Sequence, residues 1–221
     1  MASFFNLILD TTAPAGVSLK INAGAAYTSS TTVALTIGTS DATTTGYQMK
    51  IWGISIATTE AAASWETFAT SKSVTLPTGD GTKTVYVKIR DSVLNESASV
   101  SASIILDTIA PVVNITGPDV STISKISGAN TAAFSFQVDE IFTEYKVKVV
   151  PNTSSLQDAG TQIPTTAGST NMSGTNSTGF PANTAINCTI NGTDLQSASA
   201  ADGTKIIKVF AKDKAGNWSV V

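Results

Sequence analysis

Acidic side chains and one cysteine are the residues of this chain that could do chemistry. Asp139 and Glu140 form an adjacent carboxylate pair, and two carboxylates are the machinery of glycoside hydrolysis. The pair follows an apolar run, however, and acidic residues are mostly exposed, so a solvated turn is the preferred interpretation. Cys188 lies in an apparent strand, where a lone cysteine is usually a small buried hydrophobe. The chain contains no histidine, the commonest general base. We therefore expect no enzymatic activity.

Calcium is the one cofactor that the aspartates bring into consideration. Asp10 and Asp107 occupy equivalent positions at domain junctions, and Asp91 and Asp213 occupy equivalent strand ends. Ca²⁺ takes six or more oxygen ligands, and no dense Asp-x-Asp cluster supplies them. The preferred interpretation is that these aspartates build turns by accepting hydrogen bonds from nearby backbone. No other metal or cofactor is expected.

These residues lie on two copies of one pattern. Three segments of the first copy return in the second: Leu9–Pro14 as Leu106–Pro111, Tyr47–Trp52 as Tyr145–Val150, and Asp80–Lys83 as Asp202–Lys205. The offsets are 97, 98 and 122 residues, which place an insertion of 24 residues between Val150 and Asp202. A fixed repeat of this kind indicates a duplicated structural module.

Inside each copy the apolar residues alternate with polar ones. The alternating sets are Val33, Leu35 and Ile37, then Val85, Val87 and Ile89, and in the second copy Phe134, Phe136 and Val138. Period-two alternation is typical of antiparallel sheets with one face on a core. The Ala-rich stretch Thr59–Ala69 is predicted to be a loop with one helical turn at most. Short strands at this spacing predict an all-β fold of two tandem immunoglobulin-like β-sandwich domains.

The domain ends carry a family resemblance. The segment Asp202–Thr204, followed by a strand and then Ala211–Asn217, is similar to the immunoglobulin-like repeats of bacterial surface proteins and phage virion proteins, as is the Leu-Asp-Thr-x-Ala-Pro junction. The first copy departs from that pattern because Asp91–Asn95 lacks the glycine, and neither copy has paired cysteines. The resemblance implies a non-enzymatic structural or binding role. The expected organisation is an N-terminal strand at 1–10, one domain at 11–107 and a second at 108–221.

The N-terminal residues predict contact with a neighbouring subunit. Ser3–Asp10 align at offset 97 with Val100–Asp107, the last strand of the first domain, whereas at offset 122 the second domain reaches only the equivalent of Ser99. An open sheet edge is a template for a donated strand, and head-to-tail donation builds a ring or a filament. The residues expected in this contact are Phe4, Phe5, Leu7, Ile8, Leu9, Val220 and Val221. Two other interpretations stay open: a first strand of the same domain, or a piece of a longer array.

The insertion is the feature that differs between the copies. It falls within residues 151–185, where Gly, Ser, Thr, Asn and Pro dominate. A loop of this length is usually functional or disordered. Residues that could recognise a ligand are Met172, Asn176, Phe180 and Asn183, but an extra hairpin that covers a sheet edge or touches a neighbour is preferred.

Composition limits the partners. Charged residues make up only 13% of the chain and the net charge is −3, so nucleic acid is not expected. The N-terminal apolar run has no basic region before it and is too short to span a bilayer, so neither secretion nor membrane insertion is expected.

The leading hypothesis is a phage virion component, made in the host cytoplasm and bound to copies of itself or other virion proteins. The alternative is part of an adhesin on the bacterial surface that binds a glycan or a host protein. Trp52, Trp65 and Trp218 could stack on sugars, but Trp52 and Trp218 lie at strand ends and are expected in the core.

Overall fold

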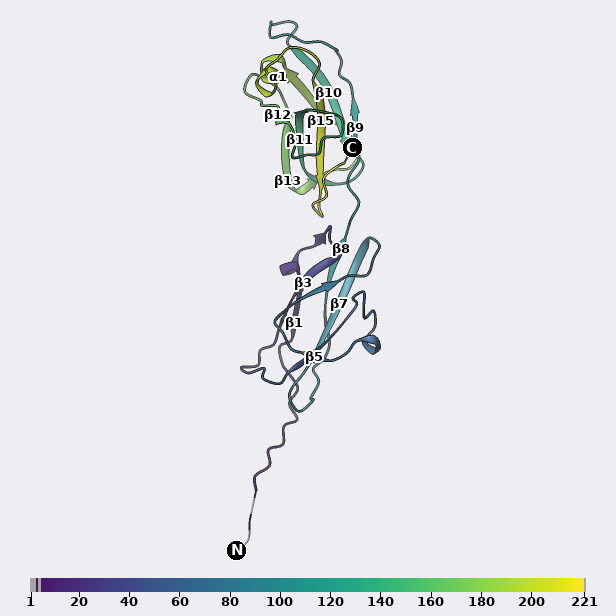
Figure 1. Cartoon of the computed structure of the whole chain (residues 1–221), viewed down its shortest axis with the longest axis vertical. Helices are drawn as coiled ribbons and strands as arrows, with labels where there is room; N and C mark the ends of the chain where they lie inside the picture. Colours follow the sequence, from purple (N-terminus) through teal and green to yellow (C-terminus); the bar gives the residue numbers. More distant parts are fainter. Residues whose placement is uncertain (1–2, 4, 221) are drawn as a thin grey trace. The chain divides into compact units, whose positions relative to one another are not determined.

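The computed structural model describes residues 3 and 5–220 of the chain (Figure 1). The chain divides into two compact units, Met1–Thr108 (unit 1) and Ile109–Val221 (unit 2). Strands form most of the regular structure in both units, so the predicted all-β fold of two tandem sandwiches is confirmed. None of the helices in the described residues is long and apolar enough to cross a membrane.

Unit 1 consists of two facing sheets. Its strands are β1 (Ser18–Ile21), β2 (Tyr27–Thr28), β3 (Thr32–Gly38), β4 (Gln48–Trp52), β5 (Glu66–Thr67), β6 (Ser71–Thr75), β7 (Gly81–Arg90) and β8 (Val100–Leu106). One sheet has the order β1–β3–β6 and the other β2–β8–β7–β4–β5. Two 3₁₀ turns, Asn22–Gly24 and Glu60–Ala62, lie between strands. The second is the single helical turn expected within Thr59–Ala69.

The core of unit 1 is built from the alternating residues. Val33, Leu35 and Ile37 on β3 are at most 2% exposed, and Val85 and Val87 on β7 are fully buried. Their neighbours along each strand are exposed or half-buried. Branched and apolar side chains suit such a pleated, half-buried surface, which is why the period-two pattern predicted these strands correctly.

Unit 2 repeats this arrangement with additions. Its strands are β9 (Val113–Thr116), β10 (Thr131–Val138), β11 (Phe142–Val150), β12 (Thr161–Gln162), β13 (Ser173–Phe180), β14 (Ile186–Asn191) and β15 (Ile206–Asp213). One sheet has the order β14–β10–β9, and in the other β11 pairs with β15 and with both β12 and β13. The core is more aromatic than that of unit 1, because Phe136, Phe142 and Tyr145 pack with ring centroids 5.1–6.5 Å apart.

The short helix α1 (Gly192–Ala198) was not expected from the sequence. Asn191 caps it, since its side-chain oxygen accepts a hydrogen bond from the Thr193 amide. At Gly192, an added Cβ would lie 1.9 Å from the Ser124 carbonyl oxygen, so only glycine fits there. Seven residues are too few for a periodic sequence signal, and a tertiary contact selects the glycine.

The pairing of strands corrects one alignment between the copies. Tyr145 pairs with Ala211, the counterpart of Ile89 at offset 122, and Ile89 itself pairs with Met49. Tyr145 therefore corresponds to Met49 and not to Tyr47, so the offset at this strand is 96 and the insertion has 26 residues rather than 24. The sequence alignment was wrong because a shift of two residues leaves the alternation unchanged.

Candidate functional site

The N-terminal segment of unit 1 is extended and apolar. Phe5, Leu7, Ile8 and Leu9 are 86–90% exposed and belong to no strand. The described part of the segment runs away from the sheets of unit 1 (Figure 1). The interpretation of these residues as a first strand of their own domain is therefore wrong, because the first strand begins at Ser18. Two other residues expected in the contact, Phe4 and Val221, lie outside the described residues.

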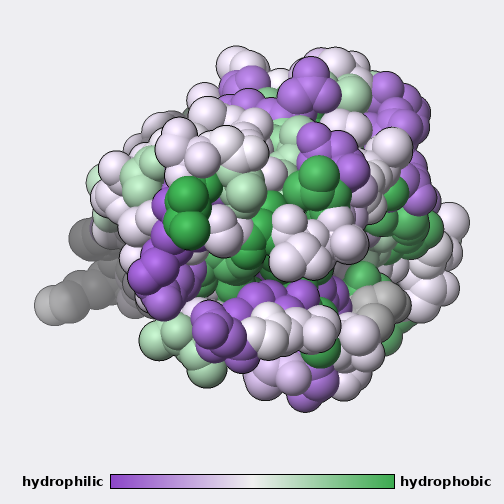
Figure 2. Space-filling model, turned by 90° about the horizontal axis from the view of Figure 1, so that it is seen from above, coloured by the Kyte–Doolittle hydropathy of each residue, from purple (hydrophilic) through white to green (hydrophobic). Residues whose placement is uncertain are grey.

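Unit 2 has a groove of about 350 Å³ along β15. One wall is the β15 stretch Ile207–Phe210, and the other is residues 110–113 with Ile115. Ser219 and Val220 also line it, and Val220 is 69% exposed. The lining is mostly apolar, and Val112 and Ile115 are 53% and 49% exposed. On the face of unit 2 seen from above, hydrophobic residues lie in small groups between hydrophilic ones (Figure 2).

In unit 1 the position that corresponds to this groove is occupied by strand β8. β7, the counterpart of β15, pairs along one edge with β4 and along the other with β8. β15 pairs with β11, and among the described residues its other edge carries only an isolated bridge between Lys212 and Trp218. The difference shows in the core: Val85 is fully buried, whereas its counterpart Ile207 is only half-buried.

The turn that follows β7 in unit 1 and the turn that follows β15 in unit 2 make the same hydrogen bonds. The Ile89 amide donates to the Ser97 hydroxyl and the Ser97 amide to the Ile89 carbonyl. Ala211 and Ser219 make the same two bonds in unit 2. Since β8 begins three residues after Ser97 and the described residues end one residue after Ser219, none of them fills the β8 position in unit 2.

The aspartates considered for calcium are engaged in turns. Asp91 accepts hydrogen bonds from the amides of Val93 and Asn95 at 2.9 Å and from the Asn95 side chain at 2.8 Å. Burial alone would raise the pKa of Asp91, but the hydrogen bonds from Asn95 and Val93 outweigh it and lower the pKa. Asp10 accepts a hydrogen bond from the Thr12 amide.

Asp213 repeats the loop of Asp91. It accepts from the amides of Gly216 and Asn217 and from the Asn217 side chain, at 2.6–2.8 Å. Each asparagine also ties the loop to the start of its own unit, since Asn95 donates to the Asp10 carbonyl and Asn217 to the Ile109 carbonyl. The interpretation that these aspartates build turns is thus confirmed for Asp10, Asp91 and Asp213. Asp107 is half-buried at the end of unit 1.

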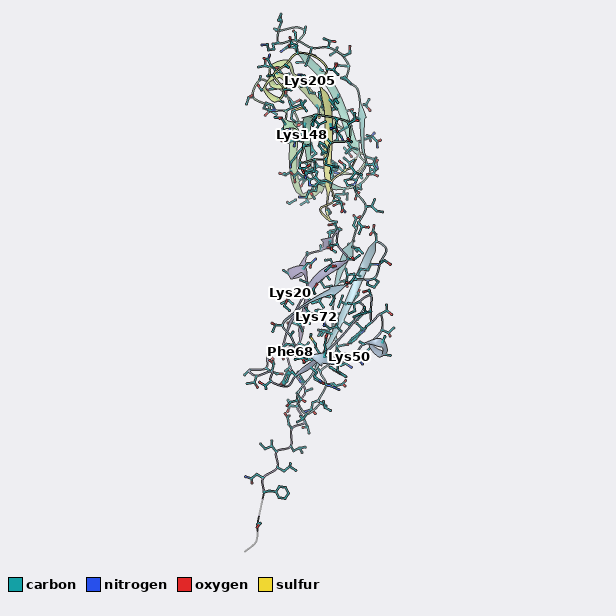
Figure 3. The ribbon with its side chains drawn as sticks, viewed as in Figure 1. Lys20, Lys50, Phe68, Lys72, Lys148 and Lys205 are labelled. Atoms are coloured by element: carbon teal, nitrogen blue, oxygen red, sulfur yellow. The ribbon has the colours of Figure 1, made fainter. Side chains whose placement is uncertain are left out.

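The insertion in unit 2 covers an edge of the sheet, as the preferred interpretation predicts. β12 and β13 both pair with the side of β11 that faces away from β15. The loop before β12 is held as well, because Lys148 (Figure 3) donates to the Gln157 carbonyl and Lys208 to the carbonyls of Thr153 and Ser155.

The residues chosen as recognition anchors have other roles. Met172 is 1% exposed in the core, and Phe180 stacks on Phe142 with ring centroids 4.9 Å apart. Both are unsuitable as ligand anchors, because an apolar residue in a polar loop more often packs inward. Asn176 shapes a turn by accepting from Thr178 and donating to the Gly179 carbonyl. Asn183 is exposed with φ 52°, and its backbone amide donates to the Val138 carbonyl.

Asp139 and Cys188 both have structural roles. Asp139 accepts a hydrogen bond from the Val112 amide at 2.8 Å, so it fixes the entry of the chain into unit 2, in a turn as expected. Cys188 is 2% exposed in the core, and burial raises the pKa of its thiol to about 12. The interpretation of Cys188 as a buried hydrophobe is confirmed.

The tryptophans lie on outer sheet faces. Trp52 is 8% exposed and stacks on Tyr86 at 5.4 Å, so it cannot offer a face to a sugar. Arg90 lies 4.3 Å from the ring of Trp65, with Lys50 (Figure 3) at 5.8 Å. Trp218 is half-buried beneath Lys146 rather than in the core, contrary to expectation. Cations cover both rings, an arrangement that stabilises the strand surface.

Sequence reasoning missed one buried carboxylate, Asp194 on α1. Its side chain is fully buried and accepts hydrogen bonds from the amides of Ala167 and Ser169 and from the Thr166 hydroxyl, at 2.8–3.0 Å. Burial alone would raise the pKa of Asp194, but these hydrogen bonds lower it. The carboxylate therefore pins the insertion to α1. The run Asn191–Asp194, which is typical of a helix start, was the available signal.

Comparison with known proteins adds little beyond the fold. No protein-family model and no curated protein matches the sequence. Among solved structures, the chain is similar to the fibronectin(III)-like modules of Clostridium thermocellum CbhA, with 12% identity and a TM-score of 0.45 over 92% of this chain and 90% of that chain. A likeness at this level supports no argument about function.

Proposed function

We propose that this chain is a non-enzymatic structural component of a phage virion: a decoration, fibre or tail-associated protein that assembles through strand and surface contacts with neighbouring subunits. The observation that carries the proposal is the exposed apolar segment Phe5–Leu9. Four large apolar side chains in water favour association, because burying each one stabilises a complex by about 1.5–3 kcal/mol.

The rest of the molecule supports a structural role. Of the groups that could have been catalytic, Asp139 accepts a hydrogen bond from the Val112 amide and the Cys188 thiol is buried in the core. Asp91 and Asp213 hold equivalent loops in the two units, which is typical of modules kept for their shape. The resemblance of these domain ends to the repeats of virion and surface proteins is consistent with the virion assignment and with the adhesin alternative.

The virion assignment is tested on phage particles. Particles purified from the strain that carries the gene should contain the chain by mass spectrometry, and capsid and tail genes should flank it. Finding the chain only in the cell envelope, with secretion genes alongside, would instead establish the adhesin alternative.

A second groove in unit 2 favours that alternative. It is an open groove of about 650 Å³ along β11, and its lining includes the polar residues Glu144, Lys146 and Thr161. Such groups suit the hydroxyls of a glycan. A glycan array would test this, and loss of the array signal in a Thr161→Val variant, but not in Ser177→Val outside the groove, is the expected result for an adhesin.

A further inference from the structure

We propose that residues 3–9 of one chain bind in the groove of unit 2 of a second copy, as an added strand antiparallel to β15. The inference deepens the assembly part of the proposed function and rests on it. It names the partner, the donor segment and the acceptor edge.

The acceptor is the backbone edge of β15. In unit 1 the same edge of β7 is paired with β8 from Gly81 opposite Leu106 to Val87 opposite Val100. An edge strand with free amides and carbonyls readily adds another strand. The paired residues Gly81–Val87 of β7 correspond at offset 122 to residues 203–209. The added strand would therefore run along residues 203–209.

The walls of the groove suit apolar side chains. Val112 and Ile115 are about half exposed, and Ile207 is only half-buried at a position where unit 1 has a fully buried valine. Among the described residues, unit 2 thus presents a partly exposed core position beside the edge of β15 that faces away from β11. An incoming strand with apolar residues on one face would complete both.

The donor segment has the required pattern. At offset 97, Phe5, Leu7 and Leu9 correspond to Ala102, Ile104 and Leu106 of β8. Ala102 and Ile104 pack in the core cluster of unit 1. Ile104 and Leu106 are each 1% exposed. The repeat therefore assigns Phe5, Leu7 and Leu9 to the groove, and Asn6 and Ile8 to the outer face.

The pattern gives a test with a matched control. Leu7→Lys/Leu9→Lys places charges on the inward face, while Asn6→Lys/Ile8→Lys adds the same charge to the outward face. Residues 6–9 are exposed in the free chain, so both variants are expected to fold. In light scattering across a concentration series, the unchanged chain and the outward variant should form rings or filaments, and the inward variant should stay monomeric. Equal disruption by both variants, or a monomeric unchanged chain, would overturn the proposal.

Peptide binding separates this contact from other interfaces. A peptide of residues 3–10 should bind the chain that lacks residues 1–9, and the inward substitutions should weaken it at least about ten-fold. The outward substitutions should change the affinity less than about three-fold. Absence of binding would contradict strand donation, whereas absence of the chain from phage particles would contradict only the virion assignment.

The register is tested by a disulfide. The pairing of Thr84 with Ser103 in unit 1 places Asn6 opposite Ile206. A chain with Asn6→Cys and Ile206→Cys should form disulfide-linked multimers, and the pair Asn6→Cys with Lys208→Cys should not. Buried Cys188 does not compete. A disulfide confined within one chain would show that the segment fills its own unit 2, and would refute exchange between copies.

Discussion

At the scale of single residues, burial and hydrogen bonding decide which groups are chemically available. Cys188 and Asp194 are both buried, but their ionisation shifts in opposite senses. Burial raises the pKa of the thiol, whose sulfur donates to the Asn171 carbonyl, whereas amide donors lower the pKa of the carboxylate. The charged form survives in a core only where hydrogen bonds replace water.

Asp194 is expected to stabilise unit 2. Asp194→Asn removes the charge from buried amides and should lower the free energy of unfolding by about 1–3 kcal/mol in urea titration. Because the folded pKa is depressed, the contribution is complete above about pH 5 and declines as the pH falls through about 4 and below. The variant should lose this pH dependence. The exposed Asp158→Asn is the control, and an equal effect there would remove the assigned role.

Cys188 should be unreactive in the folded chain. With a pKa of about 12, almost no thiolate exists at pH 8, and the core excludes reagents. An aromatic disulfide reagent should label Cys188 only after denaturation, while a Ser177→Cys variant should add one thiol that is labelled at once. Rapid native labelling of the unchanged chain would show that the core opens.

At the scale of elements, the loops of Asp91 and Asp213 close the two units in the same way. Each loop satisfies backbone amides at the end of a long strand and, through its asparagine, contacts the first residues of its unit. A turn that makes the same contacts twice is a requirement of the fold.

Asn95 and Asn217 should contribute equally to the stability of their units. Asn95→Ala and Asn217→Ala each remove a side-chain donor to a carboxylate and to a carbonyl, and each should lower the free energy of unfolding by about 1 kcal/mol. Asn187→Ala, at an exposed site, should have almost no effect. Calorimetry measures all three, and a strong effect in one unit alone would contradict the equivalence of the loops.

At the scale of the whole molecule, each unit has a core of its own. The proposed donor belongs to unit 1 and the acceptor to unit 2, so each unit alone has half of the contact. A contact between unlike surfaces continues until a ring closes or a filament grows.

The two units, when produced as separate fragments, should therefore form only a 1:1 complex. Fragments 1–108 and 109–221 should each melt cooperatively and form a 1:1 complex when mixed, without growing further. Fragment 11–108, which lacks the donor, should not bind. A complex that forms without residues 1–10 would point to a different interface.

The prediction from sequence succeeded where the pattern was local. Alternation located β3, β7 and β10, and the repeat indicated two modules. It failed at α1, at the core positions of Met172 and Phe180, and in the alignment of Tyr145, because each depends on contacts between residues far apart in the chain. A period of two also cannot distinguish a shift of two residues.

The sequence by itself determined the fold class and the duplication, because these follow from side-chain periodicity and from the repeated segments. Only the tertiary structure decided that the insertion covers a sheet edge, that the aspartates close turns, and that no other described strand than β11 pairs with β15, beside a groove. Pairing and burial are properties of chain segments brought together, and no local pattern encodes which partner is present.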